Sequence, residues 1–192
     1  MSKKNPQKIV DEKVGLKKSS RENDSSLNSK EIIRLELETK SVTILQSAIQ
    51  EITNLSIKSI PKEAIGLLSG REIRPKELFI SKGIYVTEGE EYSVSFSEED
   101  FNVFEQLTGS EYCVGWWHSH PGFGLFLSQT DISTHIFSFQ LVQPLSVALV
   151  VDPIDVGVDG IAKYKFFQVT GDSKSKSFRY KDIASYLAKS PD

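Results

Sequence analysis

Apolar and polar residues follow two different spacings along this chain, and each spacing predicts a different element. Alternation from Ile33 to Glu38 predicts a half-buried strand. Apolar residues three and four positions apart between Ser41 and Leu55 predict an amphipathic helix. Short runs rich in apolar residues predict further strands at residues 64–70, 77–86, 92–96, 112–117, 145–151 and 161–170.

Further helices are predicted from the residues that begin and end them. Ser97 and the acidic residues after it suit a helix start, and this helix is expected to run to about Leu107. Ser128 is the expected N-cap of a helix from Gln129 to about Gln140, and a short helix is expected from Lys181 to Ala188. Strands and helices are mixed without the regular alternation of a parallel barrel. The expected class is therefore α/β or α+β, with one central mixed β-sheet flanked by helices.

The composition divides the 192 residues into one domain and two polar ends. Residues 1–29 are rich in lysine, serine and asparagine, which predicts a disordered tail that acts as a solvated spacer. Residues 30–170 hold the apolar segments and form the expected domain, and residues 171–192 form a second polar tail that carries the short helix.

Charge, hydropathy and cysteine count exclude several classes of protein. The formal net charge of −3 gives no basic face for nucleic acid. No run approaches the ~20 apolar residues that a membrane span needs. No apolar stretch follows the lysines near the start, so a secretory signal is not expected. The single cysteine, Cys113, allows no intrachain disulfide, so a cytoplasmic protein is expected. Cys113 itself is expected to be a small buried hydrophobe.

His118 and His120 leave the strand predicted at 112–117, and residues two apart in an extended segment point to the same side. Two imidazoles presented together form a ready pair of zinc ligands. A catalytic zinc takes a third protein ligand and keeps a fourth position for water. Asp131 is the obvious third ligand, since it lies in the first turn of a predicted helix, where a carboxylate is favoured.

The complete string HSHPGFGLFLSQTD closely resembles the motif of the JAMM (MPN+) metalloprotease family. Upstream, PKEAIGLLSG resembles the glutamate segment of the same family, with Glu63 at the position of its essential glutamate. The resemblance covers residues from Ile33 to about Thr170 and implies a single MPN domain with one catalytic Zn²⁺.

The resemblance also implies a role for each residue of the motif. His118, His120 and Asp131 would bind the zinc, which lowers the pKa of its bound water from 15.7 to roughly 7. Glu63 would act as general base and then acid, and Ser128 would stabilise an oxyanion as well as, or instead of, capping the helix. His135 is expected to lie behind the ligands or in solvent, although an extra ligand is conceivable.

Four aromatic residues near the motif carry weaker expectations. Phe123 and Phe126 flank the glycine-rich loop, where they either line a substrate groove or pack under the loop. The neighbouring Trp116 and Trp117 are expected to face opposite sides of their strand in structural roles.

Within the family, the motif is most similar to those of the proteasome-lid and signalosome deubiquitinases. That similarity implies cleavage of ubiquitin or a ubiquitin-like modifier from lysine, with the proteasome or another activating protein as the expected partner. The segment from Thr87 to Ser95 is the expected edge for the modifier's tail, and proline at Val94 or Ser95 is expected to weaken cleavage.

The sequence departs from those deubiquitinases in two ways, and two alternative functions stay open. Leu125 and Phe126 stand where the close relatives carry Cys-Trp, and only a short polar segment follows the last predicted strand. A compact, stand-alone member of an archaeal or simplified modifier system is therefore expected. The alternatives are a peptidase for a sulfur-carrier protein or small amide, and a zinc-stabilised module that binds the modifier without cutting it.

Overall fold

The computed structural model describes residues 32–89 and 110–189. In chain order its elements are β1 (Arg34–Leu35), β2 (Ser41–Leu45), α2 (Gln46–Ser59), β3 (Glu63–Arg74), β4 (Glu77–Gly89), β5 (Tyr112–Ser119), α3 (Gln129–Thr134), the π-helix η2 (His135–Gln140), β6 (Val147–Val156), β7 (Ala162–Asp172) and β8 (Ser177–Ala188). The predicted N-terminal tail, the strand at 92–96 and the helix that follows it lie outside the described residues.

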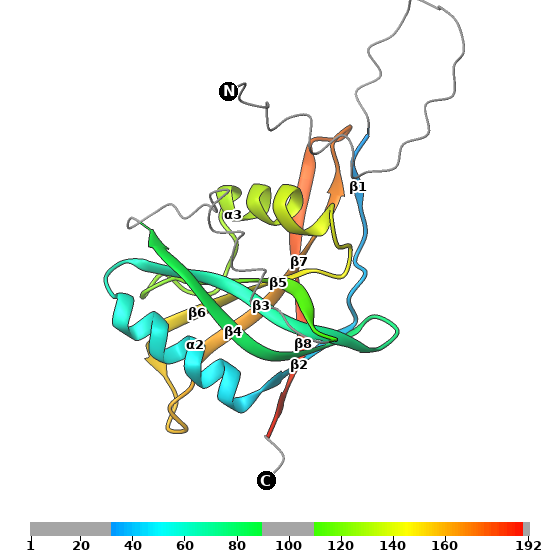
Figure 1. Cartoon of the computed structure of the whole chain (residues 1–192). Coiled ribbons are helices and arrows are strands. Elements are labelled where there is room, and N and C mark those ends of the chain that lie inside the picture. Colours follow the sequence, from blue (N-terminus) through cyan, green and yellow to red (C-terminus); the bar gives the residue numbers. More distant parts are fainter. Residues whose placement is uncertain (1–31, 90–109, 190–192) are drawn as a thin grey trace, which may run out of the picture. The chain divides into compact units, whose positions relative to one another are not determined.

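A single mixed sheet joins all eight described strands (Figure 1), as the α+β prediction required. The strand order is β1-β7-β6-β5-β3-β4-β2-β8, with a further pairing between β7 and β8 that closes the sheet on itself. The β5–β6, β2–β4 and β2–β8 pairs are parallel, and the other pairs are antiparallel. Strand β5, which carries the histidine motif, lies between β3 and β6 in the middle of this order.

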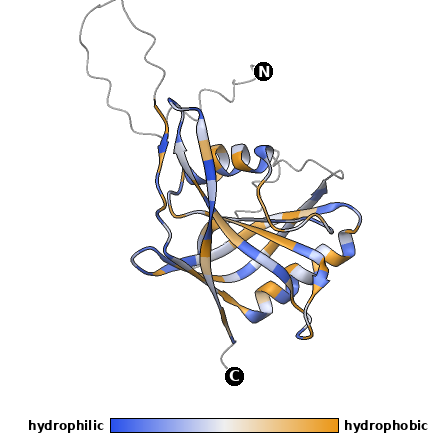
Figure 2. Cartoon of the chain, turned by 180° about the vertical axis from the view of Figure 1, so that it is seen from behind, coloured by the Kyte–Doolittle hydropathy of each residue, from blue (hydrophilic) through white to orange (hydrophobic). Residues whose placement is uncertain are grey.

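Two hydrophobic cores form on opposite faces of β5. One core joins the buried side of α2, through Ile49 and Ile52, to Trp117. The other joins α3 and η2, through Ile132 and Phe139, to Trp116. Figure 2 shows hydrophobic stretches running along the strands between the two helices. The two tryptophans therefore face opposite ways, as alternation along a strand predicts.

Two of the predicted N-terminal elements are shorter than expected. The strand predicted from Ile33 to Glu38 is reduced to Arg34–Leu35, because the backbone N–H groups of Glu38 and Thr39 donate to the buried side chain of Gln168 instead of to a strand. The helix expected from Ser41 begins only at Gln46. Ser41–Leu45 is a strand, with Val42 and Ile44 buried on one face and pairing with β4 and β8.

The predicted helix at 181–188 is wrong, and so is the second polar tail. These residues belong to β8, whose first half pairs with β7 up to Ile183 and whose second half pairs with β2. The domain expected at 30–170 therefore extends to Ala188. Hydrogen bonds to β7 and β2 therefore decide the structure of residues 181–188 against the local preference for a helix.

The helix predicted from Gln129 to Gln140 changes type at its middle. Its first part is α-helical, and from His135 it is a π-helix in which the N–H of Leu141 donates to the carbonyl of Ile136 at 3.0 Å. No helix in the described part of the chain is long and apolar enough to cross a membrane.

Candidate metal centre

His118 and His120 meet at the end of β5. His118 lies within the strand, beside Ile65 of β3 and Val150 of β6. The backbone N–H of His120 donates to the carbonyl of Val151 at 2.8 Å, which keeps the chain extended one residue past the strand. The two rings consequently point to the same side, with 3.0 Å between their Nε2 atoms.

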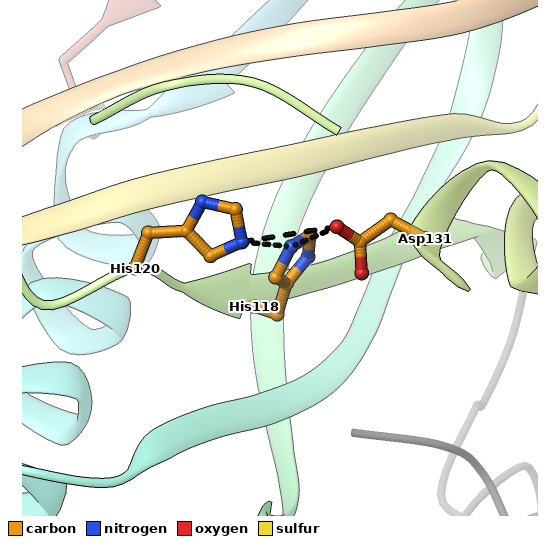
Figure 3. A group of neighbouring side chains, drawn as sticks. All are labelled: His118, His120 and Asp131. Carbon is orange, nitrogen blue, oxygen red and sulfur yellow. Dashed lines mark hydrogen bonds and ion pairs between the residues drawn. The ribbon is translucent and has the colours of Figure 1, made fainter. Parts of the chain in front are cut away.

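Asp131 reaches the histidines from the start of α3 (Figure 3). Ser128 caps this helix: its Oγ accepts from the Asp131 N–H at 3.1 Å, and its own N–H donates to Asp131 Oδ2 at 2.7 Å. This reciprocal capping box holds Asp131 Oδ2 at 3.5 Å from His118 Nε2 and 3.8 Å from His120 Nε2. All three side chains are buried, and their ligand atoms lie within 4.8 Å of one another.

The protonation of these groups suits a cation. His120 Nδ1 lies 3.2 Å from the carbonyl of Gly124, so the hydrogen belongs on Nδ1 and the Nε2 lone pair faces the cluster. Burial, and then the neighbouring His118, lower the pKa of His120 to about 4, so the ring is neutral at pH 7. Burial raises the pKa of Asp131, but interactions with His118 and Ser128 outweigh it and hold that pKa below its usual range. Two imidazole nitrogens and a carboxylate are the donor set of a catalytic zinc, and these residues fit one.

Glu63 lies beside the cluster without joining it. It is the first residue of β3, it is buried, and its Oε1 is 3.9 Å from His120 Nε2. Burial raises the pKa of Glu63 to about 7, so the carboxyl group can both accept and return a proton near neutral pH.

A comparison with known families agrees with this arrangement. The family model described as JAB1/Mov34/MPN/PAD-1 ubiquitin protease matches residues 37–144, which is more than half of the chain. The chain belongs to this family. It is the family that carries the JAMM motif, so the predicted MPN fold is confirmed.

Among similar curated proteins, several are named as proteasome subunits and one as an NAD(+) hydrolase. The 26S proteasome regulatory subunit rpn11 of Schizosaccharomyces pombe is 37% identical over 103 residues, which cover 49% of this chain and 32% of that protein. RPN11 of Encephalitozoon cuniculi is 34% identical over 60% of this chain and 41% of its own length. The NAD(+) hydrolase TcpA of a Theionarchaea archaeon is 36% identical over 59% of this chain and 34% of that protein. The chain thus spans about a third of the length of the curated relatives it matches.

Two residues that support the JAMM motif were not foreseen from the sequence. Ser119 lies between the two histidines, and its Oγ accepts from the N–H of Ala64 at 2.9 Å, which ties the strand of Glu63 to the strand of His118. Asp152 Oδ1 accepts from the N–H of Gly122 at 2.9 Å and so anchors the loop after His120. Both side chains are buried polar groups, which a sequence pattern alone does not reveal.

The loop between His120 and Ser128 carries the two phenylalanines whose role the sequence left open. The Phe126 ring contacts the His120 ring, with 4.8 Å between ring centroids, and 38% of Phe126 is exposed. Phe123 is 48% exposed. Neither ring is buried under the loop, and the expectation that the two rings line a substrate groove stays a prediction.

His135 and Cys113 are not part of the metal cluster. His135 is completely buried, and its Nδ1 accepts from the indole N–H of Trp116 at 3.2 Å, so it lies behind the ligands and not in solvent. Cys113 is half-buried, and its thiol donates to the carbonyl of Gly115. Burial raises the pKa of the Cys113 thiol to about 11, which makes it a poor nucleophile.

Proposed function

We propose that this chain is a zinc-dependent isopeptidase that removes ubiquitin or a ubiquitin-like modifier from the lysine side chains of conjugated proteins. The observation that carries the proposal is the buried carboxyl group of Glu63, 3.9 Å from a histidine of a buried His-His-Asp cluster. The family description and the names of the proteasome-subunit relatives support the choice of substrate.

His118, His120 and Asp131 would hold the zinc ion. When bound there, the zinc would supply a water of lowered pKa and polarise the scissile carbonyl. Glu63 would take the proton from the attacking water and deliver it to the departing lysine amine. In the metal-free chain, burial raises the pKa of Glu63 to about 7, so its carboxyl group holds a proton more readily than an ordinary glutamate does.

Ser128 would assist through its hydroxyl hydrogen. The capping box uses the hydroxyl oxygen as an acceptor, which leaves the hydrogen able to donate to a developing oxyanion. The hydroxyl oxygen, and not only the backbone, caps the helix, so one side chain would serve both purposes.

The end of β4 supports the expected edge for the modifier's tail. Gly89 pairs with Glu63 and Thr87 with Ile65, so this end of β4 runs directly beside the base. On the edge of β4 that faces away from β3, β2 pairs only with Glu77–Ile80. No described strand pairs with Thr87 or Gly89 along that edge. An extended Gly-Gly tail could add there by backbone hydrogen bonds. Val94 and Ser95, the positions for the proline test, lie outside the described residues.

The proposed partners follow from the relatives. Proteins named as proteasome regulatory subunits support a role near the proteasome. Another activating protein and a cytoplasmic location stay predictions from the sequence. The relative named as an NAD(+) hydrolase supports keeping a small-molecule substrate as a second candidate. A sulfur-carrier protein or a small amide is the alternative that the sequence left open, and the same residues would cleave either one.

The substitution Glu63→Gln tests the proposal. The purified chain, loaded with zinc, is incubated with a lysine-linked ubiquitin-like conjugate, and zinc content is measured alongside. We expect Glu63→Gln to lose about 10²–10⁴-fold in rate and to keep its zinc, because a general base is removed and no ligand is changed. A wild-type chain that binds the conjugate and zinc but cleaves nothing would instead indicate a binding module. Cleavage of small amides without any cleavage of conjugates would favour the second candidate.

A further inference from the structure

If His118 binds a metal ion, another residue must fix the orientation of its imidazole ring. Metal-binding histidines ordinarily donate their second ring nitrogen to a carboxylate or a carbonyl, which sets their orientation. His120 follows this rule, with Nδ1 against the carbonyl of Gly124. His118 Nδ1 is buried and has no hydrogen-bond partner among the residues that the structure describes.

Trp116 supplies a flat surface for the His118 ring. The two residues lie two apart in β5 and face the same side of the strand, with 4.5 Å between ring centroids and 11° between ring planes. Phe139 of η2 stacks on Trp116 as well, also at 11°, with 5.9 Å between centroids. The orientation of the indole therefore determines the orientation of the imidazole stacked on it.

His135 fixes the indole in its plane. Its Nδ1 accepts the Trp116 Nε1–H at 3.2 Å, and both side chains are fully buried. Burial lowers the pKa of His135 to about 3, so the ring is neutral and Nδ1 is able to accept. The indole has a single donor, so this hydrogen bond between two fully buried side chains defines the direction in which Nε1–H points.

The helix that carries His135 is itself held at both ends. Asp131 and Ser128 form the capping box at its start. At its end, Gln140 exchanges two hydrogen bonds with the backbone of Val169 on β7, at 2.8 and 3.1 Å. The π-helical turn keeps His135 and Gln140 together on the buried side.

We propose that His135 is a positioning residue, which orients the metal ligand His118 through the hydrogen bond to Trp116 and the stacking of Trp116 on His118. The α3–η2 helix would then orient His118 through two residues. Asp131 lies beside His118 Nε2, and His135 holds the Trp116 ring that stacks on the His118 ring. This inference rests on the proposed metal site but not on the proposed substrate.

The test compares two substitutions that differ in one acceptor. His135→Asn places an amide oxygen near the position of Nδ1, whereas His135→Leu fills the space without an acceptor. Zinc affinity is measured by competition with a chromophoric chelator, and the cobalt-substituted proteins are compared by their visible absorption spectra, which respond to ligand geometry. We expect His135→Leu to bind zinc roughly 10–100-fold more weakly, with shifted cobalt bands, and His135→Asn to retain most of the affinity.

Two controls separate positioning from a general loss of stability. Ile136→Ala removes a neighbouring buried side chain of the same core and is expected to lower the melting temperature of the metal-free chain without changing zinc affinity. Trp116→Phe keeps an aromatic ring beside His118 but removes the donor, so replacing His135 by leucine in that background is expected to have no further effect. Trp116→Phe alone removes the same hydrogen bond without changing His135, so it is expected to weaken zinc binding as well and provides the test if His135→Leu does not fold.

The proposal is overturned if His135→Leu binds zinc and cobalt like the wild type, or if His135→Asn is as weak as His135→Leu. A wild-type chain that binds no zinc would overturn the metal site and this proposal together. A wild-type chain that binds zinc but cleaves no conjugate would contradict only the proposed function, because the affinity comparison still stands.

Discussion

Ser128 contributes to the candidate metal centre through two different atoms. Its hydroxyl oxygen accepts from the N–H of Asp131, and its backbone N–H donates to the carboxylate oxygen that faces the histidines. A substitution that removes the hydroxyl therefore leaves the second bond in place. Asp131 should stay close to its position, so capping and oxyanion stabilisation can be measured separately.

Ser128→Ala and Ser128→Gly form a matched pair for this purpose. Alanine at an N-cap costs about 1 kcal/mol of stability, whereas glycine costs only a few tenths. Both lack the hydroxyl, so we expect each to lower kcat by about 10²–10³-fold if the hydroxyl stabilises an oxyanion. Chemical denaturation and steady-state kinetics on the zinc-loaded proteins measure the two effects. An activity that follows the stability loss, with glycine near wild type, would contradict the oxyanion role.

Cys113 is the one thiol of the chain, and we expect it to have no part in catalysis. Its pKa of about 11 leaves a thiolate fraction at pH 8 that is about a hundredfold smaller than that of an ordinary thiol. Alkylation by iodoacetamide should therefore be slow, and Cys113→Ser should keep its activity within about twofold. Mass spectrometry follows the alkylation, and rapid modification with parallel loss of cleavage would show that the thiol contributes.

The ligand residues could be predicted because their chemistry depends on short spacings along the chain. His118 and His120 are two apart on an extended segment, and Asp131 follows a helix cap, so both local geometries could be inferred. The roles of Ser119 and Trp116 could not be predicted, because each depends on a contact with another element. Ser119 accepts a hydrogen bond from the N–H of Ala64, and Trp116 donates one to His135.

The elements themselves were predicted best where the apolar pattern had one interpretation. Val42 and Leu45 fit the stripe of the predicted helix, but Val42 and Ile44 also alternate as in a strand, and pairing with β4 and β8 decides for the strand. The segment at 181–188 has a single well-buried apolar residue, Ile183, so its sequence gives little sign of a strand. Its partners on β7 are more than ten residues away in the sequence, and its partners on β2 are much farther away. A local sequence pattern therefore does not predict this pairing.

Strand β8 gives a direct test of this correction. Ile183 is 6% exposed and packs in the core with α2, whereas Leu187 on the same strand is 46% exposed. We expect Ile183→Ala to lower the free energy of unfolding by about 2–5 kcal/mol and Leu187→Ala to change it by only about 0.5 kcal/mol. Urea denaturation measures both, and equally small losses would show that this segment is a solvated tail.

In the whole molecule, only one of the two faces of the sheet contributes to the metal centre. The face with α2 packs around Trp117 and contributes none of the three ligands. The face with α3 and η2 packs around Trp116 and brings Asp131 and His135 towards the end of β5. The metal centre thus lies at the edge of one core, next to Glu63 and the end of β4, where we propose that an extended substrate binds.

Cleavage of a lysine-linked ubiquitin-like conjugate by the purified, zinc-loaded chain, with and without a zinc chelator, tests the proposed isopeptidase most directly. We predict release of the intact modifier, complete loss of that release with chelator, and recovery when zinc is restored. Release that continues in the chelator after the zinc has been shown to be gone would contradict the account. So would a chain that holds one zinc ion and binds the conjugate but releases no modifier.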